Sequence, residues 1–388
     1  MAKGKKGKLR TALANHAART QQRAAERRRA DAAEASHKHK AVSLRSGARD
    51  ARSTRRPLRT VEPFACDDTI LLVGEGNFSF ALSLLRAPRS HPPHLLLATS
   101  FDEEEEVYGK YPDAQDNIAQ IRALAGANAA TVLAFGVDAG ALQKSDAVMG
   151  RQMREPGSAQ RWSKVWFGFP HVGAGHKDEQ RNVLANQLLL LRFFVSVAPL
   201  LTRGPVPAYA APKQVRADSD DDDDDDAEDD ASPGAAHIAP DRTLPSTRAP
   251  APLSPPARQG SILVTLRNAL PYTLWNVPML AKKLRQVLPS IAASAPSLPR
   301  GMHAPKLAEI DRNHASYTLW RSFQFLPQQW DGYSHRRTVG FVAGRSTENN
   351  EDLDRRPAQD AKRPGAASGR HVGTGECRTW EFALSRAV

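Results

Sequence analysis

Short apolar runs alternate with amphipathic stretches from residue 69 onward. Five apolar runs predict buried strands, at residues 69–73, 95–100, 131–137, 162–169 and 260–266. Apolar residues at helical spacing predict helices over residues 78–86, 113–125, 178–198 and 271–288. Alternating residues 317–325 and 378–384 predict two further strands. Strands separated by helices form βαβ units. The pattern therefore predicts an α/β fold, doubly wound and Rossmann-like, with a mostly parallel central sheet and helices on both faces.

Three segments lack this pattern. Residues 1–62 are rich in Ala, Arg and Lys and carry few large apolar side chains, so we expect a disordered basic arm. Residues 204–258 combine many prolines with the acidic run Asp220–Asp226, which predicts a disordered insertion. Residues 344–376 are polar and predict a loop. The sequence thus predicts one folded domain, 63–388, interrupted twice.

The charge is unevenly spread. The net charge is +12, residues 1–60 hold 18 Lys and Arg against 4 Asp and Glu, and residues 218–230 hold 11 acidic residues and no basic one. A basic protein with a basic tail favours a polyanionic partner, although such tails also serve only solubility. Basic clusters such as the opening MAKGKKGKLR act as nuclear or nucleolar signals or as RNA-binding arms. The acidic run is typical of a solvated spacer, and the alternatives are binding to basic ribosomal proteins or histones and folding back onto the arm.

Other classes are disfavoured by composition. The chain has two cysteines and no CxxC pattern, which argues against a disulfide framework and a metal site, so metal ligands are expected to be none. The same cysteine usage favours a reducing compartment. We find no apolar run of about 18 residues and no signal-peptide core, so we expect no membrane span.

A glycine-rich turn, Gly74-Glu75-Gly76, joins the first predicted strand to the first helix. Glycines let the backbone approach a ligand, and the helix N-terminus offers free amides. This pattern fits a dinucleotide, an adenosyl ligand or an ordinary tight turn. Ser79 stands where a pyrophosphate site usually has its third glycine, which disfavours a dinucleotide.

Two carboxylates follow the next two predicted strands. Asp102 comes about 25 residues after the glycine turn, where an acid binds both ribose hydroxyls of an adenosyl ligand. Asp138 follows the third strand and is a candidate for the exocyclic amine of adenine, or else only a cap. Glu103–Glu106 are expected to be solvated helix surface.

An aromatic and proline-containing loop follows the fourth predicted strand, at the expected centre of the sheet. An aromatic side chain such as Phe169 can stack on a base turned out of its helix, Pro170 stiffens the loop, and His171 can relay a proton. The alternative is a structural loop with a surface histidine.

Four stretches in this order resemble one family: GEGNFSFALSL from residue 74, SFDEEEEVYGKYPDAQDNI from 100, GFPHVGAGHKDEQRNVLANQLLLLRFF from 168 and GYSHRRT at 332–338. Together they are similar to the eukaryotic 25S ribosomal RNA (uridine-N3)-methyltransferases, which are class I Rossmann-like enzymes. The resemblance covers roughly residues 65–340.

The resemblance implies S-adenosylmethionine as methyl donor, a uridine of large-subunit ribosomal RNA or pre-ribosomal particles as acceptor, and a nuclear, nucleolar setting. It implies that Gly74, Gly76, Asn77, Phe78 and Ser79 line the donor site, with Asp102 on its ribose. Glu75 of the same turn and Asp138 after the third strand complete the expected donor site. Phe169, Pro170 and His171 would face the acceptor, with His171 as candidate base and Lys177 and Asp178 as alternatives. Arg336, Arg337 and the arm would hold phosphates.

Gly168 departs from this family, which usually has Asn before Phe-Pro-His. Either the backbone does the work, or Asn182 or Asn186 substitutes, or activity is reduced. Two readings follow, an RNA methyltransferase and a catalytically weak or inactive RNA-binding ribosome-assembly factor. A dinucleotide-dependent oxidoreductase is a third reading, which rests on the glycine turn alone.

Overall fold

The structure is a computed structural model, and it describes residues 61–150, 161–173, 178–210, 253–338 and 377–385. The chain divides into two units, 1–60 and 61–388, and all described residues belong to the second. The expected arm up to residue 60, residues 211–252 of the expected insertion and the loop 344–376 lie outside the described residues.

Seven strands form one sheet in the order β3-β2-β1-β4-β5-β7-β6. The strands are β1 Ile70–Val73, β2 Leu96–Thr99, β3 Leu133–Ala134, β4 Lys164–Gly168, β5 Ser261–Arg267, β6 Tyr317–Phe325 and β7 Cys377–Leu384. β1 to β5 pair in parallel, whereas β7 lies antiparallel between β5 and β6. The strand order reverses beside β1, because β2 lies on one side of it and β4 on the other. This confirms the predicted Rossmann-like α/β architecture.

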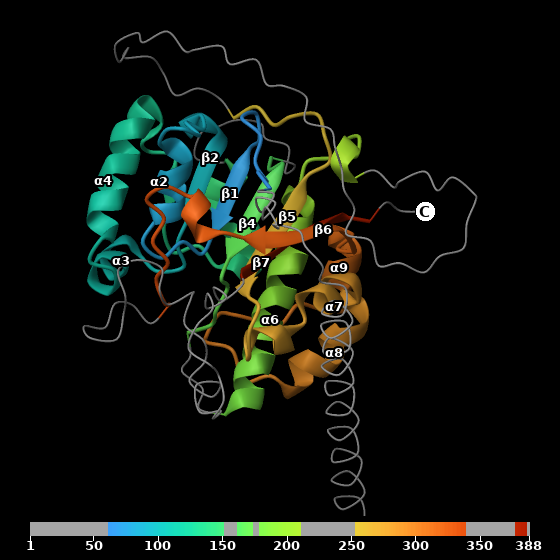
Figure 1. Ribbon diagram of the computed structural model, residues 1–388. Coiled ribbons are helices and arrows are strands. Elements are labelled where there is room, and N and C mark those ends of the chain that lie inside the picture. Colours follow the sequence, from blue (N-terminus) through green and yellow to red (C-terminus); the bar gives the residue numbers. More distant parts are fainter. Residues whose placement is uncertain (1–60, 151–160, 174–177, 211–252, 339–376, 386–388) are drawn as a thin grey trace, which may run out of the picture. The chain divides into compact units, whose positions relative to one another are not determined.

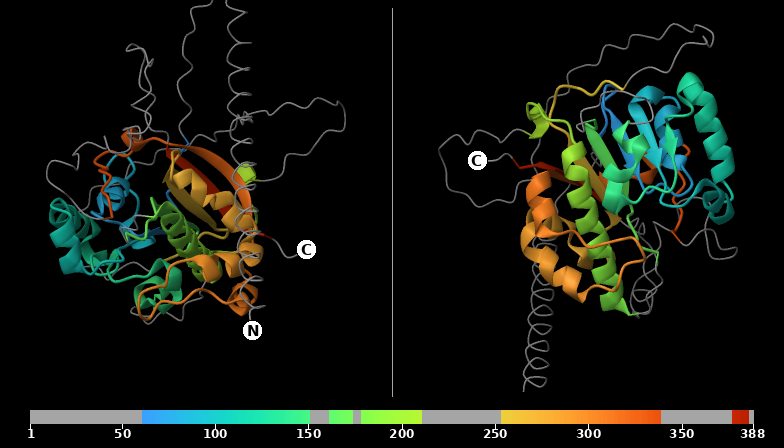
Figure 2. Two further views of the ribbon diagram at one scale, coloured as in Figure 1. Left: turned by 90° about the horizontal axis from the view of Figure 1, so that it is seen from below. Right: turned by 180° about the vertical axis from the view of Figure 1, so that it is seen from behind.

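The helices cover both faces of this sheet (Figures 1 and 2). They are α2 Ser79–Leu85, α3 Glu104–Lys110, α4 Ala114–Ala125, α5 Asp146–Met149, α6 Glu179–Val197, α7 Val277–Lys282, α8 Leu284–Ser294 and α9 Leu307–Asn313. Ile70 and Leu72 of β1 pack in one core with α2, α3 and α4. Leu71 and Val73 pack in the other with α6, α7, α8 and α9. Alternate residues of a strand point to opposite faces, which is why a sheet covered on both sides has continuously apolar strands.

Two predicted elements differ in the structure. β3 is shorter than the predicted strand 131–137, because residues 135–138 leave the sheet toward a 3-10 turn at Ala139–Lys144. The predicted helix 271–288 is divided into a 3-10 turn, Tyr272–Trp275, and helices α7 and α8. Asn276 separates the turn from α7, because it adopts a left-handed backbone (φ 48°) and its side chain accepts from the Met279 amide.

The helix α6 is long and apolar enough to cross a membrane by length and composition. However, 78% of its candidate 18-residue window is buried inside the domain. The burial accounts for its composition, since its leucines and phenylalanines fill the core between the sheet and α7, α8 and α9.

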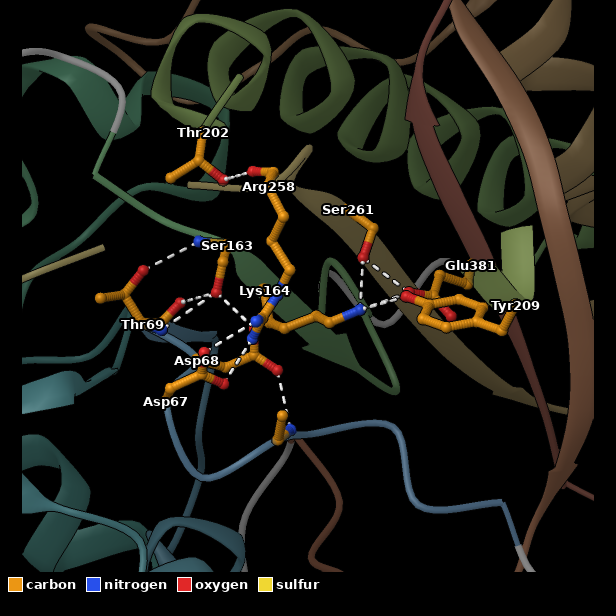
Figure 3. Close-up of polar contacts among 11 residues, drawn as sticks. Asp67, Asp68, Thr69, Ser163, Lys164, Thr202, Tyr209, Arg258, Ser261 and Glu381 are labelled. Atoms are coloured by element: carbon orange, nitrogen blue, oxygen red, sulfur yellow. Dashed lines mark hydrogen bonds and ion pairs between the residues drawn. The ribbon is translucent and has the colours of Figure 1, made fainter. Parts of the chain in front are cut away.

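The margins of the expected insertion 204–258 pack against the domain (Figure 3). Tyr209 accepts from Lys164 Nζ (2.8 Å) and donates to Glu381 Oε1 (3.0 Å). Arg258 donates to Asp67 and Asp68. These margins belong to the folded domain, so the boundaries expected from composition were too wide. The same holds for Glu62 of the expected arm, which pairs with Arg89 (3.1 Å).

Buried charges join four strands in the same region. Lys164 Nζ of β4 lies 2.6 Å from Glu381 Oε1 of β7 and 2.9 Å from Ser261 Oγ of β5. Arg321 Nε of β6 reaches the other oxygen of Glu381 at 2.6 Å. The two cations hold the pKa of Glu381 down at about 2, against the effect of burial.

Candidate active site

A cavity of about 230 Å³ opens at the carboxyl edge of the sheet, where β1, β2 and β4 end. Nine residues predicted from the sequence line it: Gly74, Glu75, Gly76, Asn77, Asp102, Asp138, Phe169, Pro170 and His171. They meet because neighbouring parallel strands end at the same edge, beside the point where the strand order reverses.

Phe78 and Ser79 lie behind the wall of this cavity. Phe78 is fully buried with a left-handed backbone (φ 59°), and its ring packs edge-on against Phe135 at 5.4 Å. Ser79 is buried, and its Oγ donates to Asn77 Oδ1 (2.9 Å). These two predicted donor-site residues therefore do not line the cavity, because packing and internal hydrogen bonds engage their side chains.

The glycines of the turn pack closely against two aromatic rings that also line the cavity. Gly74 has φ +72°, and a Cβ there would lie 3.0 Å from the ring of Phe167. A Cβ on Gly76 would lie 3.1 Å from the ring of Tyr111. Two aromatic side chains thus pack on the turn from β4 and from the end of α3. A larger residue at either glycine would need a ring to shift by a few tenths of an ångström, and at Gly74 the left-handed backbone adds strain.

Glu75 is a buried carboxyl group on the cavity wall. Burial raises its pKa to about 8, and the backbone amides of Phe80 and Ala81 in the first turn of α2 counteract this in part. The side chain is therefore mostly protonated at neutral pH, and a positive charge bound in the cavity would favour its ionised form.

Asp102 lies at the end of β2, where an adenosyl ribose was expected. Its Oδ1 accepts from Lys110 Nζ of α3 at 2.5 Å, and its backbone amide donates to Ser100 Oγ at 3.1 Å. Lys110 thus orients the carboxylate. In the part of the chain that the structure describes, Oδ2 has no hydrogen-bond partner, which leaves one oxygen for a ligand hydroxyl.

Asp138 is engaged by the protein on both oxygens. Oδ1 accepts from the Gly140 amide (2.8 Å), and Oδ2 pairs with Arg192 at 2.6 Å. The side chain therefore caps a 3-10 turn and neutralises a buried cation. The expected contact with adenine would have to use a remaining lone pair or the backbone.

Arg192 is a cavity residue that the sequence analysis missed. It comes from α6, is buried, and also donates from Nε to the His303 carbonyl (3.1 Å). A signal for it was present, since one arginine interrupts the apolar run LLLLRFF, and a buried charge needs a partner.

The loop after β4 presents Phe169, Pro170 and His171 to the cavity. Phe169 has a left-handed backbone (φ 50°), which is uncommon for an aromatic residue and occurs mainly where surrounding structure enforces it. Its ring lies 4.5 Å from the ring of His335 and 5.8 Å from that of Phe325, centroid to centroid. The strained backbone thus places an aromatic ring at the cavity.

The hydrogen bonding of His171 determines which of its ring nitrogens carries the proton. Its Nδ1 accepts from the Gly173 amide at 2.8 Å, and burial lowers its pKa, so the neutral ring predominates at pH 7. A neutral imidazole with Nδ1 as acceptor carries its hydrogen on Nε2. His171 therefore suits a hydrogen-bond donor at the cavity better than the base expected from the sequence. Of the alternatives, Asp178 caps α6, and Lys177 lies outside the described residues.

The space beside Gly168 is filled by Trp166. A Cβ on Gly168 would lie 2.1 Å from Trp166 Cη2, so no larger residue fits in this arrangement. The indole stacks on Phe80 (3.9 Å between centroids) and donates to Thr265 Oγ1 at 2.9 Å. Asn186 holds the loop by accepting from the Val172 amide (2.9 Å). Trp166 thus occupies the space that a side chain at residue 168 would take, while Asn186 binds the loop after it.

Residues 333–338 close the remaining side of the cavity. Tyr333, Ser334, His335, Arg336 and Thr338 line it. Arg336, which we expected to hold a phosphate, pairs with Asp113 at 2.9 Å, whereas Arg337 is exposed. The motif GYSHRRT was noted in the sequence, but its place against the glycine turn was not foreseen.

The sequence model of a family described as rRNA (uridine-N3-)-methyltransferase, BTM5-like, matches residues 71–337. The chain belongs to this family. The match spans every residue of the cavity except Thr338. Members are expected to bring a methyl donor and an RNA base together, and the cavity joins a glycine turn to an aromatic loop.

The chain is also similar to individual proteins and to a solved structure. The 25S rRNA (uridine(2634)-N(3))-methyltransferase of Saccharomyces cerevisiae is 24% identical over 288 residues, which cover 72% of this chain and 68% of the yeast protein. A mouse ferredoxin-fold anticodon-binding domain-containing protein 1 homolog is 33% identical over 134 residues, 34% of this chain and 18% of that protein. A 30S ribosomal A1408 methyltransferase from an uncultured bacterium covers 84% of this chain and 98% of its own at 7% identity, with a TM-score of 0.29.

The cavity has features that fit S-adenosylmethionine. The backbone of Gly74 and Gly76 lines the cavity, Asp102 Oδ2 can accept from a ribose hydroxyl, and Glu75 can balance a cation. Among the described residues, no group of three or more His, Cys, Asp and Glu side chains could hold a metal ion.

Proposed function

We propose that this protein transfers a methyl group from S-adenosylmethionine to N3 of a uridine in large-subunit ribosomal RNA. The observation that carries the proposal is the family match over residues 71–337, which includes the glycine turn and the aromatic loop that meet in one cavity. Family membership supports the reaction, and the cavity supports a donor and an acceptor base side by side.

The donor side uses the ends of β1 and β2. S-adenosylmethionine supplies an electrophilic methyl group on a sulfonium. Gly74 and Gly76 would hold its amino acid part along the backbone, and Asp102, oriented by Lys110, would accept from the ribose. Glu75 would ionise beside the bound cation, because a positive charge within a few ångströms lowers a carboxyl pKa.

The acceptor side uses the loop after β4. N3 of uridine is part of a base pair in duplex RNA, so the base must be unpaired or turned out before it reaches the cavity. Phe169 offers a ring for stacking, and Pro170 limits the freedom of the loop. His171 would donate from Nε2 to a uracil carbonyl and stabilise the negative charge on the base as the N3 proton passes to solvent water. N3 would then take the methyl group from the sulfonium, and S-adenosylhomocysteine would leave.

The cellular setting is part of the proposal. The basic N-terminal segment supports a nuclear, nucleolar location with ribosomal RNA or pre-ribosomal particles as partner, and the acidic run is a candidate contact for basic ribosomal proteins. A fluorescent fusion of the whole chain should collect in the nucleolus, and removal of residues 1–60 should disperse it. A nucleolar signal that persists after this deletion would exclude the arm as the address.

The direct test is methylation of large-subunit RNA transcribed in vitro. The RNA is incubated with protein and labelled donor, digested to nucleosides and analysed by mass spectrometry for N3-methyluridine. Calorimetry with S-adenosylhomocysteine on wild type and Asp102→Ala accompanies it, and we expect the variant to lose most affinity. A different methylated nucleoside would overturn the assigned reaction.

One alternative function is favoured by a specific observation. Gly168 replaces the usual family residue, and Trp166 occupies its space, so the acceptor site differs from the pattern of the resemblance. A ribosome-assembly factor without turnover would bind S-adenosylhomocysteine and RNA but methylate neither naked RNA nor pre-ribosomal particles. That result would reject the proposed enzyme activity and support the assembly-factor function.

A further inference from the structure

Residues 333–338, which we call the strap, are bound to the glycine turn by a set of hydrogen bonds. Asn77 Nδ2 donates to the Ser334 carbonyl at 3.1 Å. Ser79 Oγ lies 3.0 Å from the same carbonyl, and its hydroxyl hydrogen is shared between that carbonyl and Asn77 Oδ1. The Ser334 amide lies 3.0 Å from Ser79 Oγ. Two side chains of the glycine motif therefore hold the strap, and their polar atoms are engaged by it and by each other.

A second attachment lies at the start of α4. Asp113 Oδ2 accepts from Asn77 Nδ2 at 2.8 Å and from Arg336 at 2.9 Å. Asn77 thus contacts the strap directly and again through Asp113 and Arg336. This arrangement leaves the strap little freedom relative to the donor side of the cavity.

The other side of the strap contacts the acceptor loop. The ring of His335 lies 4.5 Å from that of Phe169, and Tyr333 Oη lies 3.2 Å from His335 Nδ1. A Cβ on Gly173 would lie 3.0 Å from Thr338 Cγ2, so the strap also touches the far end of the loop. The strap therefore spans from the donor turn to the residues that face the RNA base.

We propose that the strap is the second wall of the acceptor site: the target uracil stacks on the aromatic surface formed by Phe169 and His335, and Asn77, Ser79 and Asp113 position that wall. The inference rests on the proposed function and deepens it, because it names the base-binding surface. His335 contacts the substrate, and the three anchoring residues act through the strap. The alternative assignment of Asn77 and Ser79 to the donor predicts different effects of mutation.

The chemistry of the two rings supports stacking. Every nucleobase has a π face, and an aromatic contact contributes about 1–3 kcal/mol per base, which is about 5- to 150-fold in affinity. The hydrogen bond to Tyr333 orients the ring of His335, and contacts with Phe325 and His335 hold the ring of Phe169. Rigid partners lose little entropy when the base binds.

Substitution of His335 tests the contact. His335→Ala should raise KM for the RNA about 10-fold or more and leave the S-adenosylhomocysteine Kd within about 2-fold. His335→Phe should restore most of the RNA affinity, whereas His335→Gln should not, since only the former has a ring. Rescue by Gln and not by Phe would replace stacking by hydrogen bonding and overturn the proposal. His314→Ala, an exposed histidine at the end of α9, is the matched control.

Substitution of the anchors tests positioning. Asn77→Ala should raise KM for the RNA but leave S-adenosylhomocysteine binding nearly unchanged. Combined with His335→Ala it should add little, because both changes remove the same wall. Thermal unfolding identifies any variant that fails to fold. Loss of S-adenosylhomocysteine binding in folded Asn77→Ala would return this residue to the donor site and contradict us.

Photo-crosslinking separates this inference from the proposed function. RNA that contains 4-thiouridine should crosslink to peptides with Phe169 and residues 333–338 in the wild type, in the presence of S-adenosylhomocysteine and without turnover. Crosslinks without methylation would keep the uracil surface and reject the enzyme. Methylation with crosslinks elsewhere, and no effect of His335→Ala, would keep the enzyme and reject the surface.

Discussion

At the cavity, the residue type that fits at one position depends on the residue at a neighbouring position. Gly168 has no side chain because the indole of Trp166 lies where its Cβ would be, 2.1 Å from Cη2. Trp166 in turn is fixed by Phe80 and by Thr265. Any side chain at residue 168 therefore requires the indole of Trp166 to move or a smaller residue at 166, and the sequence alone shows the glycine without its partner.

Gly168→Asn should destabilise the protein by about 1–3 kcal/mol, because an added side chain overpacks a closed space. The double variant Trp166→Leu with Gly168→Asn should lose less than the sum of the single changes. Urea unfolding measures both. Gly109→Asn is the control, since a Cβ at that exposed position of α3 meets nothing within 4 Å. Additive losses would show that the two positions do not share the space.

Glu75 should make stability depend on pH. Its pKa is about 8 in the folded protein against an ordinary 4.5, so between these values the folded state binds more protons than the unfolded state. The free energy of unfolding should therefore fall as pH rises from about 4.5 to 8. Glu75→Gln should remove most of this fall. Unfolding curves of both proteins at pH 5, 7 and 9 would check it, and parallel pH profiles would refute it.

At the scale of elements, a single buried carboxylate connects four strands. Glu381 of β7 binds Lys164 of β4 and Arg321 of β6, and Ser261 of β5 donates to it at 2.6 Å. Hydrogen bonds satisfy the buried charges, so removal of one partner leaves an uncompensated charge in the core.

Lys164→Met should cost about 3–5 kcal/mol, as for other broken buried pairs. Since the pKa of Glu381 is lowered to about 2, its stabilisation is present above pH 4.5 and is lost as pH falls toward 2. Urea unfolding at pH 7 and pH 3 should show that the free energy of unfolding falls more between these pH values in the wild type than in Lys164→Met. Arg122→Met breaks the exposed pair with Glu104 and should cost less than about 1 kcal/mol. Equal losses in the two variants would contradict the assigned burial effect.

The strands and most helices could be predicted from the sequence, because apolar runs and helical spacing record which side chains are buried. The run at 69–73 predicted β1 almost to the residue. The antiparallel position of β7 between β5 and β6 was not predictable, since pairing depends on residues far apart in the sequence.

The site was predictable where strand ends carry polar or glycine residues. Gly74, Asp102 and His171 meet in the cavity as the order of parallel strands requires. Arg192, Trp166 and His335 were missed because a helix interior, a strand and a distant segment supply them. The proton position on His171 depends on a hydrogen bond to Gly173, which no pattern of residue types encodes.

At the scale of the whole molecule, charge should govern RNA affinity. The net charge is +12, and the first 60 residues hold 18 of the basic residues. RNA binding should weaken steeply with salt, because each neutralised phosphate releases counterions. Removal of residues 1–60 should flatten the slope of log affinity against log salt, with turnover at saturating RNA retained. Filter binding at several salt concentrations tests this, and an unchanged slope would exclude the arm from the contact.

The position of β7 has a consequence for synthesis. β7 is the last strand along the chain, yet it lies between β5 and β6 and brings the carboxylate that neutralises Lys164. A nascent chain that has emerged only as far as residue 338 therefore exposes the edges of two strands and an uncompensated lysine. The sheet is complete only after residue 384 has been added. A ribosome that stalls before this point would therefore hold an incomplete domain with unpaired strand edges, which is exposed to chaperones and proteases.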